Sequence, residues 1–502
     1  MSIKRRKAPK TSEPRAKSPL RRKLIPACIL LLIVLGLVEA LCYFGLKVID
    51  KKNRLTTLYS LIPDDADKTT LYDDFIASNQ ADVDLGWDEK AVVRGRPQLK
   101  PLEKRAFASA YGDSMAYSGE VEDDQSWEHM LEQVTGRTFL NLGVSGYGTD
   151  QSYLKFLKYY EKYPSDYVIL GILPDDINRL LLAVPNYRWR TTPIVTKPRY
   201  VITAEGIVLQ ENPLQEKADY YKLLESRFLS SISQNDECYL HYKNCYGFDF
   251  VYGRRFPYTL GLLKAVIGQS RHGLVTSAWG DPQGLYTEGT DASRLMRHVI
   301  DEFHRKCNEF RCTPIVMIHC DARQDIEEYE YLLPFIEYIR GRGILVINIR
   351  DLFVTELSSG KVELQELLAP GGHYSFFANQ IIAQRLARFF DLLAEGKTEE
   401  ATAYYASGLH AEVDYVTAHT RAGLAYTRSG EVAPANLQNA LYHCNKAGQL
   451  NPRNVEALFA LGKVFKLTGH ADRSRACFLE ALRLQPTHKG AAKALGRDSG
   501  QD

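Results

Sequence analysis

"RAFASAYGDSMAYSGEVEDDQSWEHMLEQVTG" (residues 105–136) places a strand pattern, a sharp turn and a helix pattern in immediate succession. The apolar run 105–111 predicts a buried strand. The following Gly112-Asp113-Ser114 predicts a tight turn, because glycine tolerates backbone conformations that other residues avoid. The segment 123–136 predicts a helix with Asp123 or Asp124 as its N-cap and Gly136 at its end.

The same alternation continues beyond this stretch. Short apolar, strand-like runs occur at 138–142, 167–172, 314–319 and 344–348, with amphipathic helical patterns between them. Continuous apolar strands that alternate with helices predict an α/β fold with a parallel sheet covered on both faces. Between about residues 180 and 291 the alternation fails, and the chain becomes aromatic and rich in Gly and Pro. We interpret 180–291 as an insertion, either a lid or substrate wall or a structural cap.

The N-terminal region predicts a membrane anchor. Residues 1–23 contain ten Lys or Arg against one acidic residue, which indicates a disordered basic tail. Residues 24–46 contain a single charge, Glu39, and are long enough for a bilayer-spanning signal anchor. The basic tail predicts an N-terminus in the cytoplasm, so the rest of the chain would lie outside, anchored to the cytoplasmic (inner) membrane of a bacterium. Residues 47–100 would be a juxtamembrane linker, and a buried core helix is the alternative for 24–46.

Charge and cysteine content narrow the function classes. The net charge is +2, which gives no indication of nucleic-acid binding. Two cysteine pairs, Cys238/Cys245 and Cys307/Cys312, are spaced as short-loop disulfides would be outside the cytoplasm. Zinc is the rival interpretation, but neither pair is accompanied by a second CxxC or a histidine pair at ligand spacing. We therefore expect no metal and no cofactor.

The C-terminal region, 397–495, contains helical patterns only. Gly462, Phe465 and Gly469 follow the spacing of a tetratricopeptide repeat, and an earlier Gly-aromatic-Gly set, from Gly423 to Gly430, has the same spacing. We expect two such repeats, which bind a protein partner and pack on a neighbouring helix or on the α/β domain.

Three candidate residues are predicted at the edge where open α/β sheets place their sites, two of them after strands and one before the last helix. Ser114 is a candidate nucleophile near helix amides, and the Gly-rich turn at 141–151 could direct the Gly146 amide to the same edge. His373 precedes the last helix of the domain and is a candidate general base, because histidine exchanges protons near neutral pH. The structural alternative is that Ser114 and His373 only begin helices.

The order of these motifs resembles the SGNH/GDSL hydrolase superfamily. The resemblance rests on four motifs, which are GDS at 112–114, N-x-G-x-S-G at 141–146, a Gly-x-Asn-Asp-like loop after 171, and Gly-His-Tyr-Ser at 372–375. The resemblance implies a flavodoxin-like three-layer α/β/α sandwich over 101–395 and activity on ester bonds. It also implies that Ser114 is the nucleophile, that the N–H groups of Ser114 and Gly146 stabilise the oxyanion, and that His373 is the base.

Two positions depart from the family pattern. Asp175-Asp176 stand where the family has Asn-Asp, so we assign the amide of the oxyanion hole to Asn178. Pro370 stands where the family has the acid of the triad, so His373 would be oriented by another acid, by a backbone carbonyl or by nothing. Asp321 and Asp351, both just after strands, are further candidates for that acid.

Three functions are compatible with this sequence. The first is an extracytoplasmic esterase that removes acyl groups, mainly acetyl, from a glycan or a small ester. The second is an O-acyltransferase that passes the acyl group from the same serine to a sugar hydroxyl. The third is a non-catalytic glycan-binding or scaffold protein of an envelope assembly. Pro370 and Asp175 favour this third function.

Overall fold

The computed structural model describes the chain in segments, which are residues 19–53, 70–78, 80–187, 193–234, 236, 239–240, 257–260, 262–263, 282–320, 329–369, 372–406, 413–428 and 433–496. Several residues considered above lie outside this set, namely 1–18, Cys238, Cys245, Asp321, Pro370 and Gly430. The chain divides into two compact units, of which one comprises 1–66, 186–191 and 224–275 and the other comprises the rest.

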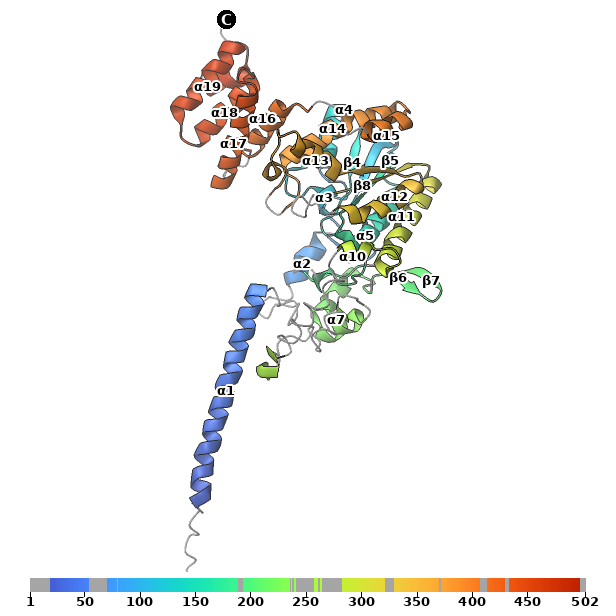
Figure 1. The fold of residues 1–502 in the computed structure, drawn as a ribbon, viewed down its shortest axis with the longest axis vertical. Coiled ribbons are helices and arrows are strands. Elements are labelled where there is room, and N and C mark those ends of the chain that lie inside the picture. Colours follow the sequence, from blue (N-terminus) through green and yellow to red (C-terminus); the bar gives the residue numbers. More distant parts are fainter. Residues whose placement is uncertain are drawn as a thin grey trace, which may run out of the picture. The chain divides into compact units, whose positions relative to one another are not determined.

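A parallel five-stranded sheet lies at the centre of the larger unit (Figure 1). Its strands are β3 (Ala106–Tyr111), β4 (Phe139–Asn141), β5 (Ser165–Ile172), β8 (Thr313–Ile318) and β9 (Leu345–Asn348). Their order across the sheet is β4-β3-β5-β8-β9, and every neighbouring pair is parallel. The predicted α/β class with a parallel sheet is therefore confirmed.

Helices cover both faces of this sheet, so its strands are apolar on both sides. In β5, Val168, Leu170 and Ile172 belong to one buried cluster and Ile169 to the other. The first cluster contains side chains of α5 (Thr149–Tyr159), α11 (Asp291–Phe310) and α12 (Leu333–Gly341). The second contains side chains of α4 (Trp127–Thr135), α13 (Ile349–Ser358) and α14 (Phe376–Ala394).

The helix after the serine turn begins later than predicted. Residues Asp123–Gln125 form a short 3-10 turn, η2, and the N-cap of α4 is Ser126, whose Oγ accepts the His129 N–H at 3.4 Å. The prediction of Asp123 or Asp124 as N-cap was wrong, because the serine hydroxyl two or three residues later satisfies the first free amides of the helix. Gly136 ends α4 at φ 68°, as predicted.

One N-terminal helix, α1 (Pro19–Asn53), is long and apolar enough to cross a membrane or to act as a signal sequence. Its apolar span is Pro26–Gly45, none of which is buried within the described structure.

In the larger unit, α2 (Thr70–Ala77) is followed by the short antiparallel pair β1 (Ala81–Asp82) and β2 (Gly86–Trp87). Part of the predicted linker packs on the sheet domain, since Lys155 and Asp88 form a buried ion pair.

The described parts of the 180–291 insertion are mostly short. They comprise a hairpin of β6 (Arg199–Thr203) and β7 (Gly206–Gln210), the helices α7 (Ser226–Ser233) and α10 (Pro282–Tyr286), and the turns η3 (Pro185–Tyr187) and η4 (Lys217–Leu224). The short helix α6 (Asp176–Arg179) directly precedes the insertion.

The C-terminal region is helical, as expected. It contains α15 (Thr398–Ala406), α16 (Tyr415–Ala425), α17 (Pro434–Leu450), α18 (Val455–Leu467), α19 (Ala471–Leu484) and α20 (Lys489–Ala494). Glycines permit close approach within the pairs α16/α17 and α18/α19. A Cβ on Gly423 would lie 2.2 Å from Cys444 Sγ, and one on Gly462 would lie 2.6 Å from the Phe478 ring.

Cys307 and Cys312 are buried free thiols in the structure, not the disulfide favoured above. Helix α11 ends at Phe310 and is capped by Arg311, which adopts φ 56°. The turn brings Cys312 back over the helix end, where its Sγ lies 3.5 Å from the Cys307 carbonyl oxygen and donates to it.

Glu128 in α4 makes stability depend on pH. Its side chain is buried, and burial raises the pKa of its carboxyl to about 8. The folded state thus holds a proton that the unfolded state releases near pH 4.5, so stability is greatest at acid pH and falls as pH rises through about 8. The loss is at most about 5 kcal/mol, at about 1.36 kcal/mol for each unit of the pKa difference. We expect Glu128→Gln to flatten this slope and raise Tm at pH 8, whereas Glu132→Gln on the same helix should not. Equal slopes in both variants would contradict this assignment.

Candidate active site

Ser114 lies at the carboxyl edge of the sheet, directly after β3. It begins the short helix α3 (Ser114–Tyr117), which Asp113 caps by accepting the Met115 N–H at 2.9 Å. Gly112 makes this turn possible, since a Cβ there would lie 2.7 Å from the Ala116 Cβ and 3.3 Å from Gly171. The serine side chain thereby emerges where parallel strands of α/β proteins present their sites.

The structure brings His373 to this serine. His373 Nε2 lies 2.7 Å from Ser114 Oγ, although the two residues are 259 positions apart in the chain. The segment around the histidine is held on both sides. The His373 carbonyl accepts the Ala369 N–H at 2.8 Å, and the Ser375 hydroxyl caps α14 by accepting the Ala378 N–H at 3.0 Å. A hydroxyl at this distance from an unprotonated ring nitrogen can donate its proton to that nitrogen.

Glu120 completes the arrangement from the other side of the ring. Its Oε1 lies 2.9 Å from His373 Nδ1, an ion-pair distance, although the N–H is not aligned as in a hydrogen bond. The carboxylate favours the tautomer with the proton on Nδ1, which leaves Nε2 free to accept from Ser114. About a third of each side chain is exposed, so solvent weakens the interaction.

Sequence reasoning missed Glu120 because it looked for the acid near the histidine or just after a strand. Glu120 instead follows the serine by six residues, in the loop between α3 and η2. Of the acids considered, Asp351 lies in the first turn of α13, 3.7 Å from Arg350, and burial raises the pKa of its carboxyl. Asp321 lies outside the described residues. A signal was present in the acidic, Gly-containing loop itself, which places a carboxylate beside the nucleophile.

Arg94 holds the Glu120 loop in place. This nearly buried side chain donates to the carbonyls of Tyr117 and Val121, which flank Glu120, and its Nε pairs with Asp123 at 3.0 Å. Because both anchors are backbone carbonyls, the loop is fixed independently of its side chains. Arg94 therefore positions the carboxylate without touching the reacting atoms.

The predicted oxyanion groups are placed less completely. The Gly146 loop lies beside the serine turn, since the Val144 N–H donates to the Gly112 carbonyl at 3.0 Å. Within the described residues, the N–H groups of Ser114 and Gly146 have no recorded acceptor, as donors kept for an oxyanion would be. Gly146 adopts φ 83°, a conformation that favours glycine.

Asn178, the predicted amide donor, is buried on α6. Its Nδ2 donates to Asp175 Oδ1 at 2.9 Å. The aspartate that stands where the family has asparagine is therefore paired with Asn178. In the described part of the chain Asn178 has no hydrogen bond with Ser114 or His373. The structure does not bring Asn178 to the serine in the way it brings His373.

A buried ion network supports the serine turn from below. Arg179 Nη1 lies 3.1 Å from Asp113 and 2.8 Å from Asp176, and it also donates to the Tyr147 carbonyl at 2.6 Å. Burial raises the pKa of Asp176, and the Arg179 charge opposes that shift. Burial also lowers the pKa of His319 to about 4, so this ring beside Gly171 is neutral at pH 7. The network ties the loops after β3, β4 and β5 together.

Gly143 allows the β4–α5 loop to touch the serine helix. A Cβ at this position would lie 2.4 Å from the Tyr117 backbone nitrogen and 2.8 Å from the Ala116 carbonyl carbon. Because backbone cannot yield as a side chain can, Gly143→Ala should displace α3, lower stability by about 1–3 kcal/mol and lower the reactivity of Ser114. Gly448→Ala, whose Cβ meets nothing within 4 Å, is the matched control. Thermal unfolding and activity assays measure both, and a Gly143→Ala variant indistinguishable from this control would contradict the packing argument.

A polar cleft of about 600 Å³ borders this group. Its lining includes Glu120 and Ser375 from the serine site, and Tyr426, Arg428 and Asn436 from the C-terminal helical region.

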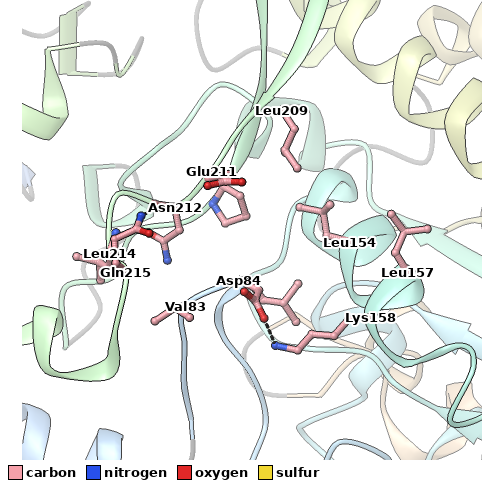
Figure 2. A pocket seen from close by; sticks show the side chains of 12 residues that line it. Val83, Asp84, Leu154, Leu157, Lys158, Leu209, Glu211, Asn212, Leu214 and Gln215 are labelled. Atoms are coloured by element: carbon pink, nitrogen blue, oxygen red, sulfur yellow. Dashed lines mark hydrogen bonds and ion pairs between the residues drawn. The ribbon is translucent and has the colours of Figure 1, made fainter.

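A second cavity, of about 440 Å³, contains none of these residues. Figure 2 shows its walls, which come from the β1–β2 region, from α5 and from the segment that follows β7, with Lys158 paired to Asp84. Of these two cavities, the first adjoins the Ser114 group.

No protein-family model matches the chain, and no curated protein matches it in sequence. The chemistry of the site therefore rests on its own residues.

Proposed function

We propose that this protein is a membrane-anchored serine ester hydrolase similar to the SGNH/GDSL superfamily. It would act outside the cytoplasm of a bacterium on acyl esters, chiefly O-acetyl esters of a polysaccharide. The observation that carries the proposal is the chain of contacts from Ser114 Oγ to His373 Nε2 at 2.7 Å and from His373 Nδ1 to Glu120 at 2.9 Å. Serine-dependent acyl transfer and hydrolysis use a nucleophile, a base that contacts it, and an acid that orients the base.

The fold supports the same assignment. Counted in chain order, the five strands are arranged 2-1-3-4-5, the order of flavodoxin-like doubly wound sheets, whose sites lie at the carboxyl edge. Ser114 follows β3 and the Gly146 loop follows β4. His373 lies in the loop before α14, so the order of the three groups along the chain is the one that the family resemblance implies. Helix α1 supports membrane anchoring, and the paired helices α16–α19 support tetratricopeptide-like repeats that recruit a protein partner.

The mechanism follows from these positions. His373 Nε2 takes the Ser114 proton as Oγ attacks the acyl carbon, and Glu120 stabilises the imidazolium that forms. The N–H groups of Ser114 and Gly146 hold the oxyanion. His373 then returns the proton to the departing sugar oxygen, and a water molecule activated by the same base releases the acid. No metal or cofactor takes part in this sequence.

The cleft favours a second candidate, transfer of the acyl group to a sugar hydroxyl. It is polar, contains tyrosines and offers space for an acceptor next to Glu120. Exclusion of water from the acyl-enzyme would turn hydrolysis into transfer. The non-catalytic alternative rested on Pro370 and Asp175. It has less support, because Glu120 lies 2.9 Å from His373 Nδ1, where it would take the role left open by Pro370.

Labelling with a fluorophosphonate probe tests whether the serine is activated. The full chain in detergent should be labelled, and peptide mass spectrometry should place the label on Ser114. Acetylated oligosaccharide offered with and without an unacetylated acceptor then distinguishes free acetate from acetylated acceptor. A folded wild-type protein that neither reacts with the probe nor releases acetate would leave the binding-protein alternative.

A further inference from the structure

A second cluster of reactive side chains lies at the joint between the α/β domain and the C-terminal helices. Glu366 belongs to the 3-10 turn η7 (Leu364–Glu366), His419 to α16 and His443 to α17. One candidate ligand atom from each residue lies within 4.8 Å of the other two. All three residues are buried, with exposed fractions of 3%, 0% and 4%.

The internal contacts of this cluster leave hydrogen-bonding capacity unused. His419 Nδ1 lies 2.9 Å from His443 Nδ1, and His419 Nε2 lies 3.8 Å from Glu366 Oε1. Among the described residues, neither His419 Nε2 nor Glu366 Oε1 has a hydrogen-bond partner. Buried polar atoms without partners are costly, and two that face each other at this distance leave room for a bridging ion.

The chemistry of the donors selects the ion. Two imidazoles and one carboxylate form a nitrogen and oxygen set that suits zinc, whose ligands lie at about 2.0–2.2 Å. Two such ligands in a tetrahedral site are about 3.4 Å apart, which small side-chain rotations reach from the observed separations.

Neighbouring groups hold the rings in place. Phe377 stacks on His419 with centroids 4.4 Å apart, and Tyr426 stacks on His443 at 5.9 Å. The Glu366 carboxylate lies beside the Tyr442 hydroxyl, and the Glu366 carbonyl accepts the Ser375 hydroxyl at 2.6 Å. Metal sites are generally built with such supporting contacts around the ligands.

We propose that Glu366, His419 and His443 bind one divalent zinc-class ion that fastens the first C-terminal helix pair to the α/β domain. The ion would also steady the segment that carries His373, because Ser375, two residues later, is bonded to Glu366. This site is separate from the Ser114 group and requires no ester hydrolysis.

The test uses tag-free full chain in detergent, stripped with a chelator and titrated with Zn²⁺ or Co²⁺. The wild type should bind one ion per chain and show the visible absorption of tetrahedral Co²⁺, and saturating Zn²⁺ should raise Tm by about 5 °C or more. Glu366→Gln and His443→Gln should lose the Co²⁺ spectrum and the Tm shift. His488→Gln, which alters another histidine-glutamate pair, with Glu456 at 3.1 Å, is the matched control and should retain both.

Hydrogen exchange on the wild type keeps the test decisive if the ligand variants do not fold. Zn²⁺ should slow exchange in α16 and α17 and in the segment around Glu366, and not in α19. A wild type that binds no ion, an ion that protects other segments, or ligand variants that bind as the control does would each overturn the site. These readouts are independent of the proposed esterase activity, so a fluorophosphonate-labelled protein without metal would refute this inference alone.

Discussion

Ser114→Ala is expected to lower acyl-ester hydrolysis by about 10⁴-fold or more and to abolish fluorophosphonate labelling. The variant removes the hydroxyl oxygen that lies 2.7 Å from His373 Nε2. The fold should persist, because Asp113 caps α3 through its own carboxylate and not through the serine. Initial rates on an aryl acetate, with thermal unfolding as the folding check, measure the effect.

The matched control for this experiment is Ser118→Ala. Ser118 is a buried serine at the end of the same helix, and its hydroxyl donates to the Met115 carbonyl at 3.3 Å. It should keep nearly all activity at the cost of some stability. If Ser114→Ala retained wild-type rates, or if both serines had equal effects, Ser114 would not be the nucleophile.

Glu120→Gln is expected to reduce kcat by about 10²- to 10³-fold with little change in KM. The amide cannot stabilise the imidazolium or enforce the Nδ1–H tautomer, whereas the substrate groups that set KM are untouched. The partial exposure of Glu120 and His373 makes this effect smaller than that of a buried acid. Glu120→Asp, with a shorter side chain, should fall between the wild type and Glu120→Gln.

A pH profile separates orientation from simple loss of structure. Removing the carboxylate removes the group that orients the His373 ring, so Glu120→Gln should lower kcat across the whole pH range while Tm stays unchanged. Asp124→Asn, in the turn η2 that follows this loop and paired with Arg428 at 2.7 Å, is the control and should leave the profile in place. An unchanged rate and profile in Glu120→Gln would remove Glu120 from the mechanism.

Much of the fold could be predicted because its signals are local. The strand runs around 105–111 and 167–172 appear as β3 and β5 within one or two residues, since apolar β-rich runs between turn residues have few other solutions. The helix after the serine turn was misplaced at its start, because several capping residues compete within a few positions. The cysteine pair at 307 and 312 was also misjudged, since spacing says nothing about how a helix end orients two thiols.

The sequence by itself determined the α/β class, the apolar N-terminal helix, the helical C-terminal region and the candidates Ser114, Gly146 and His373, because each depends on short-range pattern or turn chemistry. Only the tertiary structure decided which acid faces His373. Glu120 lies in the loop that follows the Ser114 helix. Arg94, from the segment predicted to be a linker, holds that loop in place. The Glu366, His419 and His443 cluster has the same origin, three residues from separate elements whose meeting depends on packing between the sheet domain and the helices. Contacts between residues distant in sequence depend on how whole elements pack, and no local pattern records them.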